Sequence, residues 1–229
     1  MTTRIKILST LAVMGAMKDL THLHQAKTGI AIDTAFSPTM ALLDRLRGGE
    51  AADIAILTAQ GIDDLTHQGI VRSGTRIDIA LSFIGMAVKA GAPKPDIGSV
   101  DSFKAALLGA GAVAYSRIGA SGLYFAELIQ RLGIAAEINA RAVIVPSGFT
   151  AERLVNGEAA LAVQQISELL VVPGIEVVGP LPREIQTVAT FSGGLLTDSG
   201  AAAELLAFLA SPVAEPILRR AGLEPASRD

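Results

Sequence analysis

Short apolar segments alternate with helix-like segments along almost the whole chain, and this alternation limits the possible folds more than any other feature. The expected strands are rich in Ile, Val or Ala and cover residues 4–8, 30–36, 53–57, 77–88, 113–115, 142–145, 161–164, 175–178 and 185–195. Helices are expected between them, ending at the glycines Gly29, Gly48, Gly69, Gly133 and Gly157. The pattern predicts an α/β fold with largely parallel sheets, in which ligands bind beyond the carboxyl ends of strands.

The composition excludes several classes of protein. Half of the 229 residues are apolar, which excludes a disordered chain, and the length allows one large domain or two lobes of about 100 residues each. A net charge of −3 and the lack of a Lys and Arg cluster argue against nucleic acid as a partner. No segment reaches the roughly 20 continuous apolar residues of a membrane span, so membrane insertion is not expected.

The first apolar segment has some features of a secretion signal. Arg4 and Lys6 precede an apolar run over residues 7–17, as in a signal peptide. However, RIKIL is typical of a strand, and residues 16–27 have helical spacing up to Gly29. We therefore expect the first strand and helix of the fold here rather than a leader. As the sequence stands, this predicts a cytoplasmic protein, or a periplasmic one if a leader has been removed.

Two of the expected strands are longer than usual and suggest how the chain divides. Residues 77–88 and 185–195 are not amphipathic, so each can cross from one lobe to another. We expect lobe 1 to contain residues 1–80 plus 186–229, and lobe 2 to contain residues 81–185. Hinges are then expected near residues 81–86 and 187–191, with closure of the lobes when a ligand binds.

The stretch YSRIGASGLYFAELI, residues 115–129, has the composition of an anion-binding loop. A strand ends at Tyr115, and Ser121 and Gly122 begin the next helix, where free amides and the helix dipole favour a negative charge. Arg117 adds a planar fork of donors that suits a carboxylate better than a compact oxyanion. An alternative is that Arg117 is solvated or paired on the loop.

Other polar residues follow expected strands. Thr10 and Thr39, like Ser9 and Ser37 beside them, can bind a ligand or cap a helix, and one residue can do both. Ser147 and Gly148 are expected at a further helix start, with the same alternatives. Two adjacent amides, Gln164 and Gln165, end an apolar strand, where burial is costly without a partner, so we expect one of them to contact the ligand.

Catalytic and metal-binding signatures are few. There are no cysteines, GASGL is not the nucleophile motif G-x-S-x-G, and no phosphate-binding loop occurs. His22 and His24 are two residues apart on one helix and cannot share a face, while His67 lies near another helix end, so we expect neither a metal nor a cofactor. Tyr115 and Tyr124 are weak candidates for proton transfer, because neither has an evident activating partner.

Several long pieces of the chain resemble a known family. The N-terminal piece KILSTLAVMGAMKDLTHLHQAKTGIAIDTAFSPTMALLDRLRGGEAADIAILTAQGIDDLTHQGIV, with LVNGEAALAVQQISELL and AAELLAFLASPVAEPILRRAGLEP, resembles type II periplasmic binding proteins of the molybdate-binding group. The resemblance spans nearly the whole chain and extends to aconitate-isomerase-like members. It implies a two-lobed α/β fold in which each lobe is a mostly parallel sheet flanked by helices, with the ligand cleft between the lobes and, if the protein is exported, an ABC permease as a partner.

The ligand loops depart from the oxyanion-binding pattern of that family. The first loop, STLAVMGAM, leaves only Ser9 and Thr10 as hydroxyls, and the second loop, SPTMA, keeps Ser37 and Thr39. Where the family has a tyrosine in the late strand, this chain has Gln165. The resemblance therefore implies a similar fold with a different ligand.

Together these observations predict that the chain binds a small organic anion, best matched by a di- or tricarboxylate, as a solute-binding protein. The expected ligand-binding residues are Thr10, Leu11, Ser37, Thr39, Arg117, Ser121, Gly122, Ser147 and Gln165. One alternative is an isomerase of a small polycarboxylate that uses the same cleft. Another is the molybdate- or oxyanion-binding component of an ABC transporter, with backbone amides in place of the missing serines.

Overall fold

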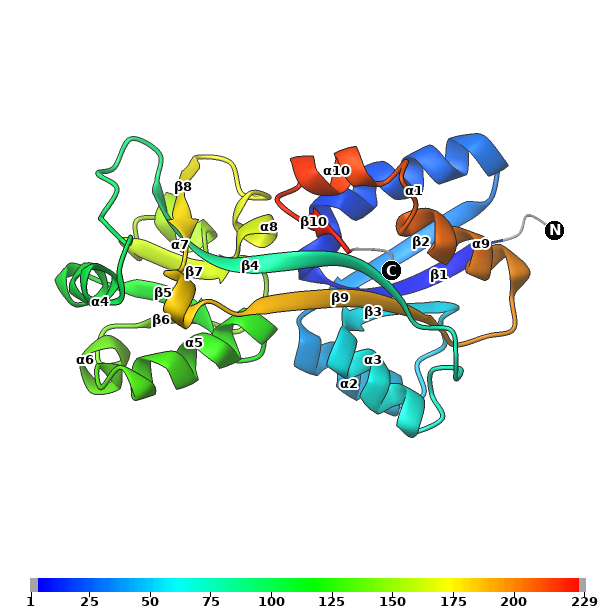
Figure 1. Ribbon diagram of the computed structural model, residues 1–229, viewed down its shortest axis with the longest axis horizontal. Coiled ribbons are helices and arrows are strands. Elements are labelled where there is room, and N and C mark those ends of the chain that lie inside the picture. The colour runs from blue at the N-terminus through cyan, green and yellow to red at the C-terminus, as the bar shows by residue number, and fades with distance from the viewer. Residues whose placement is uncertain (1–3, 227–229) are drawn as a thin grey trace. The chain divides into compact units, whose positions relative to one another are not determined.

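The structure is a computed structural model that describes residues 4–226. By the contacts within it, the chain divides into unit 1, residues 1–82 and 189–229, and unit 2, residues 83–188. The division falls after Ser82 and after Val188, two and three residues beyond the boundaries expected from the sequence. The chain passes between the units within two strands, β4 (Ile77–Lys89) and β9 (Val188–Leu195), which lie side by side (Figure 1).

Unit 1 contains a sheet in the strand order β2-β1-β3-β9-β4, with β10 paired to β4. The first three strands are parallel, and β9 runs antiparallel to β3. Its remaining strands are β1 (Arg4–Thr10), β2 (Ala31–Ser37), β3 (Ile54–Thr58) and β10 (Glu224–Pro225). Its helices are η1 (Leu11–Val13), α1 (Met14–Thr28), α2 (Thr39–Arg47), α3 (Ala59–His67), α9 (Gly200–Leu209) and α10 (Glu215–Arg220).

Alternation along the strands of unit 1 produces a core on each face of the sheet. Ile5 and Ile7 of β1 pack in the cluster formed with α1, α9 and α10, whereas Leu8 packs in the cluster formed with α2 and α3. Figure 1 shows these two groups of helices on opposite sides of the sheet. The segment at residues 4–28, which resembled a leader, therefore forms a central strand and a packed helix, as expected from its periodicity.

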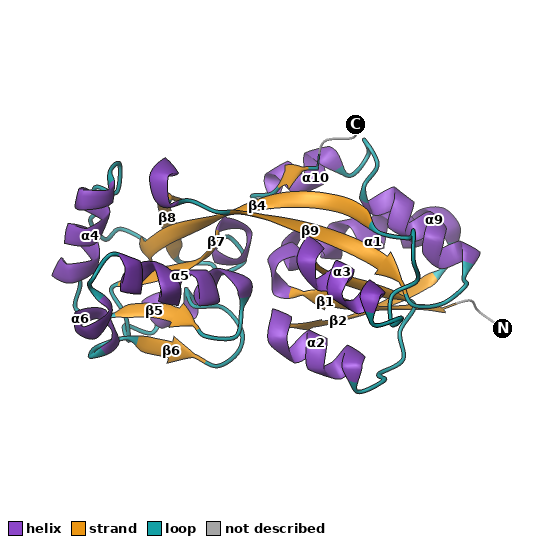
Figure 2. Cartoon of the chain, turned by 60° about the horizontal axis from the view of Figure 1, so that its bottom comes forward, coloured by secondary structure: helices purple, strands orange, loops and turns teal. Residues whose placement is uncertain are grey.

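Unit 2 has the same kind of architecture. The strand order is β4-β7-β5-β6, with β8 also paired to β4. The strands β5 (Val113–Ser116), β6 (Val143–Val145) and β7 (Leu161–Gln165) are parallel, and β5 and β6 lie side by side in Figure 2. The remaining elements are β8 (Ile175–Pro180), α4 (Val100–Gly109), α5 (Ala120–Arg131), α6 (Ala135–Asn139), α7 (Glu152–Val155), α8 (Ile166–Leu169) and η2 (Arg183–Ile185).

The ends of the helices agree closely with the expected glycines. Gly29 takes a left-handed conformation with φ of 71° and donates its amide hydrogen to Gln25 O at 2.8 Å, which ends α1. At α2 the helix ends at Gly48, but the left-handed residue is the next one, Gly49, with φ of 80°. The two-residue strand β10 was not expected, since two residues leave no periodic pattern in the sequence.

Among residues 4–226, no helix combines the length and the apolar character that crossing a membrane requires.

Candidate functional site

The residues expected to bind a ligand in unit 2 lie at one edge of its sheet. Because β5, β6 and β7 are parallel, their carboxyl ends meet at the same edge. Ser116 at the end of β5 is opposite Val145 at the end of β6, and β7 ends at Gln165. Three connections leave from this edge: residues 117–119 before α5, residues 146–151 before α7, and the direct step from β7 into α8.

The two glutamines at the end of β7 point to opposite faces of the sheet. Leu161 and Val163 pack with α5, while Ala162 packs with α7 and α8 on the other face. Alternation then places Gln165 on the α5 face and Gln164 on the opposite face.

Gln164 is bonded entirely within the protein. Its Oε1 accepts hydrogen bonds from the Thr150 amide at 2.8 Å and from the Thr150 hydroxyl at 3.0 Å. Its Nε2 donates to Gly148 O at 3.3 Å. This side chain holds the 146–151 connection against the strand end, which is a structural role.

Gln165 has no such partners. It is 2% exposed, and both side-chain atoms, Nε2 and Oε1, are buried without a hydrogen bond among the described residues. Oε1 faces the first turn of α8 in a capping arrangement, but the contact falls short of a hydrogen bond. A buried amide left in this state costs on the order of 1–3 kcal/mol. A side chain of this kind at a sheet edge is a strong candidate for a ligand contact.

The start of α5 lies on the same face as Gln165 and has no side-chain cap. Its N-cap residue is Gly119, so no side chain in the described part of the chain caps the first-turn amides of Ala120, Ser121 and Gly122. The Ser116 hydroxyl instead accepts from the amides of Ile118 and Gly119, at 3.2 and 3.4 Å. The free amides at the helix start are therefore available to an anion.

Gly122 is required by the packing of α5 against the end of β5. A Cβ atom at this position would lie 1.8 Å from Ser116 O, which no side chain can tolerate. The backbone of the preceding strand occupies the place where a side chain would be. Ser121, which is 3% exposed, stays next to the free amides.

Arg117 is exposed, and it is bonded to the protein. Its Nε and one terminal nitrogen lie 3.3 and 3.2 Å from the Tyr115 hydroxyl, and the same terminal nitrogen donates to Asn139 Oδ1 at 3.0 Å. This geometry matches the second expectation for Arg117, in which its guanidinium is paired within the protein rather than with a ligand. A carboxylate contact by Arg117 remains a prediction.

The two tyrosines considered for proton transfer are both engaged. Tyr115 is fully buried, packs edge-on against Phe125, and donates its hydroxyl hydrogen to Asn139 Oδ1 at 2.5 Å. Tyr124 donates to Ile185 O at 2.8 Å and lies beneath Arg131. Both hydroxyls therefore serve structural contacts.

Ser147 does not begin a helix, contrary to expectation. Gly148 takes φ of 80°, which a helix start does not allow, and α7 begins only at Glu152, five residues after Ser147. Ser147 itself is exposed in the connection. A ligand role for Ser147 therefore has no support from a helix N-terminus.

Sequence reasoning missed Glu168, the most unusual ionisable group in unit 2. Its side chain, in the first turn of α8, is 7% exposed, and Oε2 accepts from the Gln165 main-chain amide at 3.3 Å. Burial raises the pKa of the Glu168 carboxyl to about 8, despite hydrogen bonds from Gln165 and Gln164 that lower it. At neutral pH the group is therefore mostly an uncharged carboxylic acid. The signal in the sequence was one acid within the mainly apolar stretch ISELLVV.

Unit 1 has a comparable edge, where β1 and β2 end opposite each other at Thr10 and Ser37. Thr10, 3% exposed, is the N-cap residue of η1, but its side chain makes no capping bond. Leu11, 7% exposed, follows it as the first residue of η1. Ser9 is fully buried, and its hydroxyl donates to Thr10 O at 3.2 Å.

The second connection in unit 1 leads from β2 into α2. The Ser37 hydroxyl accepts from Arg45 Nη1 at 2.6 Å, and Arg45 in turn pairs with Glu50 at 2.7 Å. Thr39 is 8% exposed in the first turn of α2, whose N-cap residue is Pro38 and which has no side-chain cap. Thr10 and Thr39 were expected either to bind a ligand or to cap a helix, and neither side chain caps a helix in the structure.

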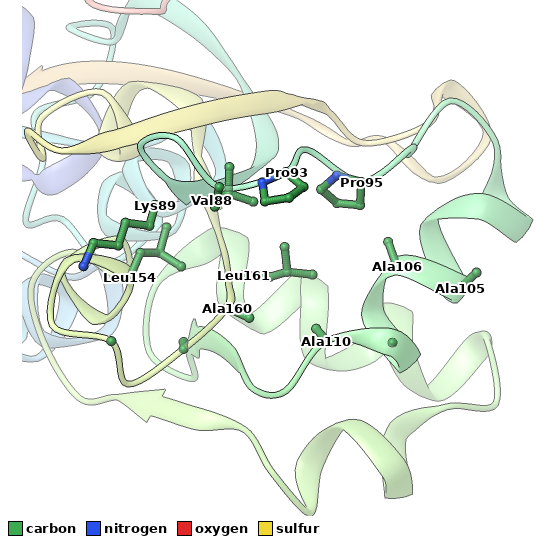
Figure 3. A pocket seen from close by; sticks show the side chains of 14 residues that line it. Val88, Lys89, Pro93, Pro95, Ala105, Ala106, Ala110, Leu154, Ala160 and Leu161 are labelled. Carbon is green, nitrogen blue, oxygen red and sulfur yellow. The ribbon is translucent and has the colours of Figure 1, made fainter.

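A cavity of about 520 Å³ in unit 2 lies away from these residues (Figure 3). It is lined mainly by small apolar side chains, among them Val88, Pro93, Ala106 and Leu161, with Lys89 beside Leu154 at one side. Leu161 is the first residue of β7 and Gln165 the last, so the cavity is at the opposite end of that strand from the candidate site. None of the expected ligand-binding residues lines it.

Among the described residues, no three His, Cys, Asp or Glu side chains are arranged to hold a metal ion. His24 is 4% exposed and packs against Phe208 with ring centroids 5.2 Å apart. Burial lowers its pKa, so the imidazole is a neutral part of the core.

The chain forms two α/β units, leaving the first unit and later returning to it. Each unit has uncapped helix starts at the carboxyl edge of its parallel strands. These features define the class of solute-binding proteins with the type II fold. The sequence model of the bacterial extracellular solute-binding proteins matches residues 5–224, and the chain belongs to this family.

Relatives of known name add detail. An aconitate isomerase from a Pseudomonas species is 36% identical over 97% of this chain and 88% of its own length. The periplasmic molybdate-binding protein of Azotobacter vinelandii has the same fold, with a TM-score of 0.80 and 16% identity over 97% of this chain and all of its own. PEB3, a Campylobacter jejuni protein, has a TM-score of 0.74 in its complex with L-phospholactate, with 15% identity over 97% of this chain and all of its own.

Proposed function

We propose that this protein binds a small organic polycarboxylate, a di- or tricarboxylic acid, as its solute. The observation that carries the proposal is the buried side-chain amide of Gln165, which has no hydrogen-bond partner among the described residues. It lies on the same face of the sheet as the free amides at the start of α5. A carboxylate has two acceptor oxygens and can take hydrogen bonds from Gln165 Nε2 and from the helix start together.

The hydroxyl groups support an organic anion over a compact oxyanion. Among the hydroxyls at the edge of unit 1, Ser9 donates its hydrogen to Thr10 O, whereas Ser37 accepts from Arg45 and keeps its own hydrogen. Ser37 can therefore donate to a ligand, as can Thr10 and Thr39, whose side chains do not cap a helix. An extended polycarboxylate needs donors at several separated points, whereas a compact oxyanion needs a dense set around one centre.

Turnover is the second candidate function, favoured by the 36% identity with an aconitate isomerase over 97% of this chain. Isomerisation of a tricarboxylate requires the same carboxylate contacts together with a group that moves a proton. A transport role would require a permease partner, whereas an isomerase role would not.

A thermal-shift screen tests the proposal. The purified protein is melted with citrate, cis- and trans-aconitate, succinate, molybdate, tungstate and sulfate, each at the same ionic strength. At a concentration 100 times its dissociation constant a ligand stabilises the folded state by about 2.7 kcal/mol, which raises the melting temperature measurably. Stabilisation by the polycarboxylates alone is the expected result. Stabilisation by molybdate or tungstate alone would refute the proposal.

A further inference from the structure

Two hydroxyl side chains at the edge of unit 1 lie on the same face of its sheet. Thr10 and Ser37 end β1 and β2 and are opposite each other in the parallel register. Leu8 packs in the cluster formed with α2 and α3, so alternation directs Thr10, and Ser37 beside it, to that face. Ala35, two residues before Ser37, packs against the same cluster. Both hydroxyls are therefore on the face that α2 covers, and α2 begins there without a side-chain cap (Figure 1).

The Ser37 hydroxyl makes only one of the two kinds of hydrogen bond open to it. Its oxygen accepts from Arg45 Nη1 at 2.6 Å, and no acceptor for its hydrogen lies among the described residues. With a guanidinium on the oxygen, the hydrogen is best placed on an acceptor, above all on an anion. The bond from the cation also polarises the O–H group and strengthens it as a donor. Ser37 is therefore prepared to donate to a ligand.

Arg45 is held in this orientation by Glu50. Its Nε donates to Glu50 Oε2 at 2.7 Å and its Nη2 to Glu50 Oε1 at 2.9 Å, which leaves Nη1 for Ser37. The turn after α2 places Glu50 there, because Gly49 is left-handed and the Glu50 amide donates to Arg45 O at 3.0 Å. Lys6 Nζ also donates to Glu50 Oε1, at 3.0 Å. A two-bond arginine–carboxylate pair within a network is the kind of surface ion pair that fixes geometry.

The bond between Arg45 and Ser37 is not what holds α2 on the sheet. Three leucines of α2, Leu42, Leu43 and Leu46, are buried in the core cluster on this face. Burial of three leucine side chains contributes far more to stability than one half-buried hydrogen bond. The position of Arg45 therefore points to a role at Ser37 rather than in the packing of the helix.

We infer that Arg45 is a positioning residue that fixes Ser37 as a hydrogen-bond donor to a carboxylate group of the solute. The inference rests on the proposed function, since it requires that a polycarboxylate binds at this edge. Arg45 itself does not touch the solute, because its three nitrogens are used on Glu50 and Ser37. Its charge acts through the serine hydroxyl.

A double-mutant cycle tests the link between the two side chains. Calorimetric titration gives the affinities for trans-aconitate and citrate of wild type, Ser37→Ala, Arg45→Met and the double variant. Ser37→Ala should bind at least about tenfold more weakly, because a hydrogen bond to a charged group is lost, and Arg45→Met at least about fivefold. The double variant should bind within about twofold of Ser37→Ala, because Arg45 has no effect once the hydroxyl is gone.

Arg47→Met is the matched control. Arg47 is an exposed arginine on the same helix, and its side chain contacts Gln68 rather than Ser37. This variant removes the same charge and should bind both acids as wild type does. A loss equal to that of Arg45→Met would show that only the net charge of the protein matters, and would overturn the inference.

The remaining outcomes separate the inference from the proposed function. Additive losses, which make the double variant about fiftyfold weaker than wild type, would show that Arg45 acts independently of Ser37. Wild-type affinity in either single variant would also overturn the inference, and in both cases the proposed function stands. If wild type binds neither acid, both are overturned.

Urea unfolding without ligand shows whether Arg45 has a structural role alone. That role predicts a loss of stability in Arg45→Met with unchanged affinity of the folded protein, which would contradict the inference. If Arg45→Met does not fold, Arg45→Lys takes its place in the cycle. Lysine keeps the charge but lacks the planar fork that binds Glu50 by two bonds while a third nitrogen reaches Ser37. The same coupling is then expected, and additive losses would again refute it.

Discussion

At the scale of single residues, the adjacent glutamines at the end of β7 show how one strand supplies both a structural and a functional group. Alternation along the strand directs Gln164 to Thr150 and Gly148, where every polar atom of its side chain is bonded. The same alternation directs Gln165 to the α5 face, where neither polar atom is bonded. The same substitution at these two glutamines should therefore have opposite effects on the stability of the fold.

Gln164→Met should destabilise the fold, because it leaves the Thr150 amide buried without a partner, at a cost of about 1–3 kcal/mol. Gln165→Met should leave stability unchanged or raise it, since it removes two unsatisfied buried atoms, and should weaken polycarboxylate binding by about tenfold. Urea unfolding and calorimetric titration measure the two effects. Equal losses of stability in both variants would show that Gln165 is also a structural residue.

At the scale of elements, the longer helices, with η1 taken together with α1 that follows it directly, divide into capped and uncapped starts. Side chains of Thr58, Ser99 and Ser199 cap α3, α4 and α9. The starts of η1, α2 and α5, at the positions where a ligand is expected, have no side-chain cap. This division suggests that the uncapped starts are kept free for a ligand.

The pair Thr58→Ala and Thr39→Ala tests that interpretation. Thr58 accepts from the Gly61 amide at 3.2 Å, so its loss should reduce the free energy of unfolding by about 1 kcal/mol without affecting ligand affinity. Thr39→Ala removes no cap and should cost less than about 0.5 kcal/mol while weakening polycarboxylate binding. Thermal unfolding with and without ligand distinguishes them, and an unchanged affinity for Thr39→Ala would remove Thr39 from the site.

The short helix α8 makes stability depend on pH in an unusual direction. The pKa of Glu168 is raised to about 8 in the folded protein, above its value of 4.5 in an unfolded chain, so the folded state binds more protons between these values. Stability should therefore fall as pH rises through this window and level off above about pH 8. His24 has a lowered pKa and affects stability only below pH 6.5, in the opposite sense.

Denaturant unfolding of wild type and Glu168→Gln between pH 6.5 and 8.5 measures this dependence. The wild-type free energy of unfolding should decrease with pH, and the variant should be nearly flat. Parallel curves for the two proteins would show that Glu168 ionises with an ordinary pKa.

The strands other than β10 could be predicted from the sequence because they form largely apolar runs between turn residues. The environment of the polar residues could not be predicted in this way. Ser147 looked like a helix start, but the left-handed Gly148 extends the connection as far as Glu152. The burial of Glu168 could not be predicted either, because the packing of β4 and β8 around α8 depends on residues about 80 positions earlier and several positions later in the chain.

At the scale of the whole molecule, the chain passes between its two α/β units within β4, which has 13 residues, and β9, which has 8. The identity of the bound solute depends on a few side chains at the sheet edges. Fold and family therefore follow from the chain as a whole, whereas the ligand depends on groups such as Gln165 and Thr10.

The central claim is that the protein has the fold of the oxyanion-binding proteins but binds an organic polycarboxylate. A competition titration by calorimetry tests it most directly, with trans-aconitate titrated into the protein in the absence and in the presence of excess molybdate at constant ionic strength. Our account predicts saturable binding of trans-aconitate that molybdate does not reduce. Binding of molybdate that abolishes the trans-aconitate signal, or no heat with trans-aconitate at all, would contradict it.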